Sequence, residues 1–202
     1  MGCNIDFRNG KIILRESNIK SAHINNKTSS AQVKSCIMLA ALGAQGQIVI
    51  NESYNTRDHT ERMLRFLSRE SVRVEGKKII LKNTILRSEN LIIPGDISKA
   101  SFLIACACLA PDSNLIIKDL VISSGRMGFI DSLNKMGANI KICNKKIRHN
   151  EPVADIEVKY NGRLKNINIT ALKIPSMIDE IPILSVVGAF SKGVMQINGL
   201  KE

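Results

Sequence analysis

Apolar and polar residues follow a pattern that occurs three times along the chain. Each copy has a polar residue at or next to its start, continues as a mostly apolar run of helical length, breaks at Gly, Pro or Ser, and ends in a β-branched stretch. The copies are residues 31–52, residues 98–119 and, more loosely, residues 178–199. The pattern predicts a protein built from repeated units in which a helix is followed by a strand.

A second helix and two short strands are predicted to follow in the first two copies. Arg57 lies near the start of one second helix and Arg126 near the start of the other. The β-branched stretches after these helices are separated by polar, turn-forming residues and predict hairpin strands. These strands are residues 72–74 with 78–81 and residues 139–143 with 154–158.

One break stands out between the repeats. Residues 92–96 (IIPGD) combine a Pro-Gly turn with a new helix start, and we place a domain boundary there. Residues 1–94 are then part of one domain and residues 95–202 part of another. Because both ends of the sequence fall inside a repeat, we expect an internal fragment of a longer repeat protein.

Composition narrows the possible partners. The net charge of +11 would suit nucleic acid, an anionic lipid or an acidic small substrate. Aromatic residues make up only 3% of the chain and Trp is absent, so few side chains could stack on unpaired bases. The lysines are scattered among Ile and Asn, which is typical of an ordinary solvated surface.

Cysteines and apolar runs indicate where the protein works. The five cysteines include no C-x-x-C pair, and Cys36, Cys106 and Cys108 lie in apolar runs, as small buried residues do in a reducing compartment. The longest apolar stretch, residues 100–111, is too short to cross a bilayer. These features predict a cytoplasmic protein with no membrane partner.

Candidate anion-binding residues lie at the start of the first repeated helix. A helix start presents unpaired N–H groups and a positive dipole end, which attract phosphates and carboxylates. Ser30 and Gln32 could add a hydroxyl and an amide there, and Arg57 could bind a phosphate through two hydrogen bonds. Alternatively, Ser30 is an ordinary helix cap, and Arg57 pairs with Asp58 or Glu61. Ser29 is a second candidate cap.

Asp179 is the candidate general base. It lies at the start of the third repeated helix, and Pro182 supports this start because proline is tolerated in a first turn. Partial burial would favour the protonated form of Asp179 and fit it for proton transfer. The alternative is that Asp179, or Ser176, only caps the helix. Glu180 is a weaker candidate, and His59 is expected to pack at a helix start.

Four blocks of sequence stand in order along the chain: residues 30–35 (SAQVKS), 56–64 (TRDHTERML), 94–98 (PGDIS) and 175–182 (PSMIDEIP). Taken together, they resemble the EPSP synthase family, the 3-phosphoshikimate 1-carboxyvinyltransferases of the shikimate pathway. No phosphate-binding glycine loop or metal-ligand motif competes with this interpretation, so neither a cofactor nor a metal is predicted.

The resemblance implies both a fold and a site. The family's fold is an inside-out α/β barrel of βαβαββ repeats, here truncated at both ends. The resemblance implies that Ser30, Ala31, Gln32 and Arg57 bind the phosphate of shikimate 3-phosphate. It also implies that Asp179 contacts the reacting 5-hydroxyl and accepts its proton. The intact enzyme is expected to be a monomer.

Parts of the family pattern have no counterpart in this sequence. The sequence lacks the family's amino-terminal Lys and Arg block, its glycine-rich phosphoenolpyruvate loop and its later arginines. We therefore expect the chain alone to lack transferase activity. We also expect that it can associate through exposed core residues. Residues 123–126 (SSGR) stand where Asn-Pro-Thr-Arg is common. The alternatives are a UDP-N-acetylglucosamine enolpyruvyl transferase-like enzyme and a basic nucleic-acid-binding module.

Overall fold

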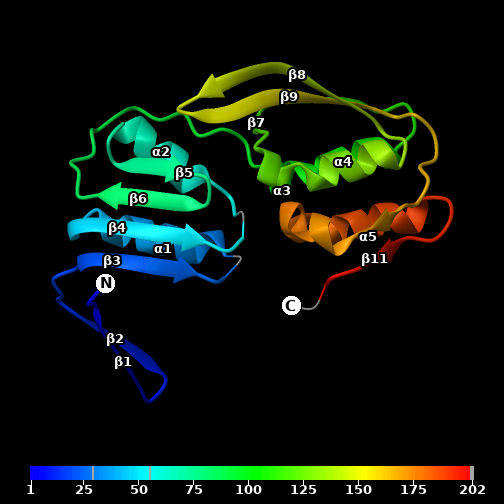
Figure 1. Ribbon diagram of the computed structural model, residues 1–202. Helices are drawn as coiled ribbons and strands as arrows, with labels where there is room; N and C mark the ends of the chain where they lie inside the picture. The colour runs from blue at the N-terminus through cyan, green and yellow to red at the C-terminus, as the bar shows by residue number, and fades with distance from the viewer. Residues whose placement is uncertain (29, 55, 201–202) are drawn as a thin grey trace. The chain divides into compact units, whose positions relative to one another are not determined.

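The chain folds into two compact units of mixed α/β structure, each with its own apolar core (Figure 1). The computed structural model describes residues 1–28, 30–54 and 56–200. The first unit is Met1–Leu91 and the second is Ile92–Glu202. Whether these units correspond to two domains of an enzyme, divided after residue 94, stays a prediction.

The first unit is a four-stranded sheet covered by two helices, with a separate hairpin at its amino end (Figure 1). The sheet order is β3-β4-β6-β5; β3 and β4 are parallel, and the other pairs are antiparallel. The elements are β1 (Asn4–Arg8), β2 (Lys11–Arg15), β3 (Lys20–Asn26), α1 (Ala31–Ala41), β4 (Gln45–Glu52), α2 (His59–Leu67), β5 (Val72–Glu75) and β6 (Lys78–Lys82).

The core of the first unit forms between the sheet and its helices. Ile48 and Ile50 of β4 alternate toward the same side as Ile79 and Leu81 of β6, and all four are almost completely buried. Met38 of α1 is fully buried and belongs to the same apolar cluster. The helix and strand predicted in residues 31–52 are thereby confirmed.

The second unit is a three-stranded antiparallel sheet with three longer helices on one side of it (Figure 1). The sheet order is β7-β9-β8. The elements are α3 (Ile97–Leu109), β7 (Asn114–Val121), the 3₁₀ turn η1 (Ser124–Arg126), α4 (Gly128–Lys135), β8 (Asn139–Arg148), β9 (Glu151–Lys159), β10 (Asn168–Ile169), the 3₁₀ turns η2 (Ala171–Ser176) and η3 (Ile178–Glu180), α5 (Ile181–Phe190) and β11 (Gln196–Ile197).

The hairpin of the second unit is longer than the sequence pattern predicts. Its strands β8 and β9 continue beyond the predicted strands and meet at His149 and Asn150, which both have positive φ as a two-residue hairpin turn requires. The register shifts between Cys143 and Lys146, where Asn144 also has positive φ. This bulge contains polar residues that interrupt the alternation of apolar and polar positions along β8. Because of that interruption, the sequence pattern predicted that the strand ends at Cys143.

The third repeat departs most from the prediction. Its helix α5 begins at Ile181 rather than near residue 178, because a 3₁₀ turn precedes it. Its N-cap is Glu180, so the expectation that Ser176 or Asp179 caps this helix is wrong. Pro182 lies in the first turn of α5 as predicted. The strand that follows is only Gln196–Ile197, paired in parallel with β10.

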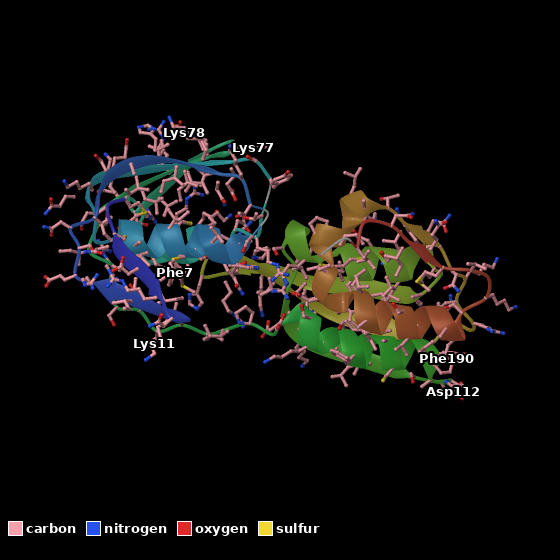
Figure 2. The ribbon with its side chains drawn as sticks, turned by 90° about the horizontal axis from the view of Figure 1, so that it is seen from below. Phe7, Lys11, Lys77, Lys78, Asp112 and Phe190 are labelled. Carbon is pink, nitrogen blue, oxygen red and sulfur yellow. The ribbon has the colours of Figure 1, made fainter. Side chains whose placement is uncertain are left out.

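Several apolar side chains are exposed. In the β1–β2 hairpin, Ile5 lies opposite Leu14 and Phe7 opposite Ile12, and the four side chains are 46% to 78% exposed. Phe190 at the end of α5 is also exposed (Figure 2). Within the described part of the chain, no helix is long and apolar enough to cross a membrane.

The cysteines correct one expectation from the sequence. Cys108 of α3 is buried as predicted, but Cys36 and Cys106 are exposed although they lie in apolar runs. Burial raises the pKa of the Cys108 thiol to about 11. Cys106 and Cys108 therefore form a matched pair, two residues apart on one helix, that differ in exposure.

We predict that iodoacetamide at pH 8 modifies Cys106 and spares Cys108 in the folded chain. The thiolate is the reactive species, and burial both hides the Cys108 sulfur and keeps it protonated. Brief labelling followed by peptide mass spectrometry measures the two sites separately. Labelling in urea, where both thiols are exposed, is the control, and equal modification in the native chain would contradict the assigned burial.

Candidate functional site

The first part of the site is the amino end of helix α1. Ser30 is the N-cap, with extended backbone angles (φ −94°, ψ 116°), and its Oγ accepts a hydrogen bond from the Val33 N–H at 3.4 Å. Ala31 and Gln32 occupy the first turn, whose N–H groups have no partner within the helix itself. Ser29, the second candidate cap, lies outside the described residues.

A pocket of about 420 Å³ lies beside this helix start. On α1, the lining side chains recur at the spacing of one helix face, and α2 and the residues before it supply the opposite wall. The lining residues are Ala31, Gln32, Ser35, Cys36, Leu39, Arg57, His59 and Thr60. Three of the four residues predicted to bind phosphate, Ala31, Gln32 and Arg57, are thus brought together, while Ser30 caps the helix. Their role as ligands stays a prediction.

The prediction missed the contact that joins the two walls. Ser35 Oγ and Thr60 Oγ1 lie 2.6 Å apart and share a hydrogen bond between α1 and α2. Ser35 follows Gln32 by three positions, so helical spacing alone could have placed it on the same face. His59 begins α2, in agreement with the expected helix-start position.

The carboxylates near Arg57 have other cationic partners. Asp58 Oδ2 lies 2.7 Å from Arg62 Nη2, and Glu61 Oε1 lies 2.6 Å from Lys34 Nζ. Burial opposes ionisation of Asp58, but the hydrogen bond and the charge of Arg62 outweigh it and keep the Asp58 pKa below its ordinary value. Asp58 and Glu61 thus form ion pairs with Arg62 and Lys34. The alternative that Arg57 also pairs with one of them stays open.

A buried lysine, Lys34, stands between the pocket residues Gln32 and Ser35 on helix α1, and the sequence prediction missed it. The Lys34 side chain is only 1% exposed, and its ammonium contacts Glu61 Oε1 at 2.6 Å and Glu52 Oε2 at 3.4 Å. The other Glu52 oxygen accepts a hydrogen bond from Thr56 Oγ1 at 2.8 Å. One signal was available, because Lys34 is the single charged residue in the helix Ala31–Ala41.

We predict that Lys34→Met destabilises the first unit by about 3–5 kcal/mol, because it leaves buried carboxylates without a cation. The double variant Lys34→Met with Glu61→Met should recover at least half of this loss, since the buried pair is then replaced by apolar groups. Urea unfolding followed by circular dichroism measures both effects.

The exposed pair of Arg73 and Glu75 provides the control for Lys34. These groups lie 2.7 Å apart, but the Arg73 side chain is 78% exposed. Arg73→Met should therefore change the free energy of unfolding by less than about 1 kcal/mol. A Lys34→Met variant as stable as Arg73→Met would contradict the importance of the buried pair.

The second unit also has an arginine near a helix start, but there the arginine binds a carboxylate of the chain itself. Asp96 is the N-cap of α3, and its Oδ1 accepts hydrogen bonds from the Ser98 N–H at 3.0 Å and from Arg126 Nη2 at 2.9 Å. Arg126 also bonds to Ser98 Oγ. Arg126 corresponds to Arg57 in the repeat. In this unit a carboxylate of the chain itself therefore lies between a helix start and the corresponding arginine.

Asp179 lies in the second unit, in the 3₁₀ turn before α5. Its side chain is exposed, so the partial burial expected from the sequence is absent in this chain. The neighbouring Glu180 is instead buried, with 3% of its surface exposed. The prediction that Asp179 serves as the proton acceptor remains untested by this geometry.

A glycine allows the segment before Asp179 to pack closely against α4. A Cβ added to Gly128, the first residue of α4, would overlap Ser176 Oγ and lie 3.1 Å from both Met177 Cβ and the Ser176 carbonyl oxygen. The side chain and backbone of this segment leave no space for a methyl group. Gly128 therefore fixes how closely α4 approaches the turn that leads to Asp179.

We predict that Gly128→Ala destabilises the second unit by about 1–3 kcal/mol through overpacking. Gly125→Ala is the matched control, because nothing lies within 4 Å of the Cβ it would add. Thermal unfolding of the two variants measures the difference. Equal stability of the two variants would show that the segment moves aside without loss.

Metal ligands do not gather at this site. Among the residues that the structure describes, no group of three or more His, Cys, Asp or Glu side chains is placed to hold a metal ion. The chemistry available in the first unit is therefore that of an arginine, an amide, hydroxyl groups and helix N–H groups, all of which can donate hydrogen bonds to an anion.

The whole chain, residues 1–202, matches the family described as EPSP synthase (3-phosphoshikimate 1-carboxyvinyltransferase). The chain belongs to this family. A curated relative named 3-phosphoshikimate 1-carboxyvinyltransferase, from Persephonella marina, is 40% identical over 100% of the chain and 48% of its own length. A relative of the same name from Legionella pneumophila is 38% identical, over 100% of the chain and 47% of its length. The chain thus spans about half the length of the curated relatives it matches.

Solved structures confirm the predicted fold class. The EPSP synthase from Acinetobacter baumannii superposes with a TM-score of 0.86 at 35% identity, covering 98% of this chain and 45% of that protein. The enolpyruvyl transferase NikO from Streptomyces tendae gives a TM-score of 0.67 at 14% identity, over 97% of this chain and 49% of that protein. The second likeness concerns the fold alone.

Proposed function

We propose that this chain supplies the shikimate 3-phosphate side of the active site of a 3-phosphoshikimate 1-carboxyvinyltransferase. That enzyme moves the enolpyruvyl group of phosphoenolpyruvate to the 5-hydroxyl of shikimate 3-phosphate and releases phosphate. The observation that carries the proposal is the common pocket of Ala31, Gln32 and Arg57, in a chain that belongs to the EPSP synthase family.

The proposed ligand is the phosphate group of shikimate 3-phosphate. In this proposal Arg57 supplies a permanent positive charge and paired N–H donors, which suit a phosphate. Ser30, Ala31 and the Gln32 amide add donors from the start of α1, where the helix dipole also favours an anion. The +11 charge of the chain would draw a phosphorylated substrate toward the site.

Asp179 is proposed as the proton acceptor of the reaction. The 5-hydroxyl would lose its proton to Asp179 as its oxygen attacks C2 of phosphoenolpyruvate, while C3 is protonated. The tetrahedral intermediate would then lose phosphate from C2 and a proton from C3, which restores the C2–C3 double bond in the enolpyruvyl product. Substrate positioning and stabilisation of charge would supply most of the rate enhancement. A cytoplasmic, monomeric enzyme acting on these small anions, with neither nucleic acid nor a membrane as partner, is part of the same proposal.

We predict that Arg57→Ala weakens binding of shikimate 3-phosphate to the chain by about 10- to 100-fold, the loss typical of charge-assisted hydrogen bonds. Binding of unphosphorylated shikimate should be much less affected, because Arg57 is proposed to contact only the phosphate. Isothermal titration calorimetry measures both affinities. Arg73→Ala, which removes an exposed arginine of the same unit, is the matched control and should leave both affinities unchanged.

Two other ligands test the competing interpretations. Binding of UDP-N-acetylglucosamine in preference to shikimate 3-phosphate would overturn the proposed substrate and favour the other enolpyruvyl transferase. Salt-dependent binding of random duplex DNA near physiological ionic strength would support the nucleic-acid-binding alternative. Equal affinity of the Arg57→Ala and Arg73→Ala variants for shikimate 3-phosphate would contradict the proposed phosphate site.

A further inference from the structure

The residue that matters most for phosphate in the proposed site lies on a segment without regular structure. Arg57 belongs to the connection between β4 and α2, and residues 53, 54 and 56–58 are in neither a helix nor a strand. Its pocket partners Ala31 and Gln32 lie on the rigid helix α1. An anion site requires a fixed distance between these donors, so the connection needs an anchor next to Arg57.

Thr56 provides such an anchor. Its Oγ1 donates a hydrogen bond to Glu52 Oε1 at 2.8 Å, directly beside Arg57 in the chain. Glu52 is the last residue of β4, where it pairs with Asn26 of β3, and its N–H donates to the Lys77 carbonyl oxygen at 2.9 Å. The Glu52 backbone is therefore fixed between two neighbouring segments of the sheet, and the hydrogen bond ties the connection to it.

The other oxygen of Glu52 ties this anchor to helix α1. Glu52 Oε2 lies 3.4 Å from Lys34 Nζ, and Lys34 follows Gln32 by two positions on the helix. The Glu52 and Lys34 side chains are 10% and 1% exposed. Glu61 of α2 contacts the same ammonium at 2.6 Å. A chain of contacts through Thr56, Glu52 and Lys34 thus connects the segment that carries Arg57 to the helix that presents the N–H donors.

The energetics of this chain of contacts favour a geometric role. Two carboxylates and one ammonium are removed from water here, and well-packed apolar side chains of similar size could stabilise the core equally well or better. Apolar contacts, however, would not specify the position of the connection, whereas hydrogen bonds and ion pairs are directional. Because there are two carboxylates, Glu52 on β4 and Glu61 on α2, the single ammonium of Lys34 fixes the positions of both elements.

We propose that Thr56, acting through Glu52 and Lys34, is a positioning residue that holds Arg57 against the start of α1. The identity of the bound anion rests on the proposed function, but the positioning of the guanidinium group does not. The proposal makes Thr56 important for anion binding although it is not among the residues that line the pocket.

A double-mutant cycle tests whether Thr56 acts through Arg57. Thr56→Val removes the hydroxyl but keeps the shape, and should weaken binding of shikimate 3-phosphate by about tenfold, the loss expected for a hydrogen bond to a charged group. In an Arg57→Ala background the same substitution should have less than about a twofold further effect, because there is no guanidinium left to misplace. An equal loss in both backgrounds, or no loss in either, would overturn the proposal.

Two control variants separate positioning from folding. Thr56→Ser keeps the hydroxyl and should restore affinity to nearly that of the unsubstituted chain. Thr84→Val removes a threonine hydroxyl that bonds to the Lys82 carbonyl oxygen elsewhere in the same unit, and should leave affinity unchanged. Unfolding midpoints of all variants show whether a lost affinity reflects a lost fold.

A measurement without ligand distinguishes failure of this proposal from failure of the proposed function. The Arg57 side-chain Nε–H resonance in a ¹H–¹⁵N spectrum, assigned from the Arg57→Ala variant, reports on the guanidinium group directly. Thr56→Val should shift and broaden this resonance, and Thr84→Val should not. An unchanged resonance would refute the positioning role even if shikimate 3-phosphate binds. A shifted resonance in a chain that does not bind shikimate 3-phosphate would support positioning and refute only the ligand.

Discussion

A single buried ammonium group connects the two helices that line the candidate phosphate site, α1 and α2, to each other and to strand β4. Lys34 projects from α1 to carboxylates at the end of β4 and in the first turn of α2. Without this charge, α2 would pack on the sheet through its apolar face alone, which specifies contact but not register. Breaking this buried ion pair is costly, but well-packed apolar side chains in place of both partners would stabilise the unit about as well. The contribution specific to the ion pair is therefore the geometry of the interface between α1 and α2. The hydrogen bond of Ser35 and Thr60 closes the same interface nearer the surface.

The parts of the fold that could be predicted are those in which local pattern and tertiary structure agree. The helix and strand of residues 31–52 follow directly from an apolar run, a break and a β-branched stretch, and the structure matches them closely. Residues 178–199 show where this reasoning fails. An apolar run with an early proline fits a helix that starts at several positions, and in the structure residues 178–180 form a 3₁₀ turn before α5 begins. The segment just before this turn packs closely against Gly128, a contact between residues distant in the sequence.

In the candidate site too, some residues could be predicted from the sequence and others could not. Gln32 and Arg57 could be named in advance because an anion site has a recognisable residue chemistry, and Ala31 because of the resemblance to the EPSP synthase family. The fold brings all three to one pocket. The network of Lys34 could not be derived, because a lysine in a helix is solvated in most proteins and its burial depends on elements distant in the sequence. For Cys36 and Cys106, apolar neighbours in the sequence did not indicate burial, since one face of a helix can be exposed while the other is packed.

The contact of Asp96 with Arg126 has a consequence for how repeated units diverge. In the first unit an arginine before the next helix lines a pocket with residues of a helix start. In the second unit the corresponding arginine bonds to the capping carboxylate of a helix start. At the first helix start the cap is the neutral Ser30, which satisfies one N–H group and brings no charge. In the second unit the carboxylate of the cap thus places a negative charge beside the arginine, whereas the hydroxyl cap of the first unit adds none. Both caps have the same extended backbone conformation, so the capping side chain, and not the backbone, sets the local charge at each helix start.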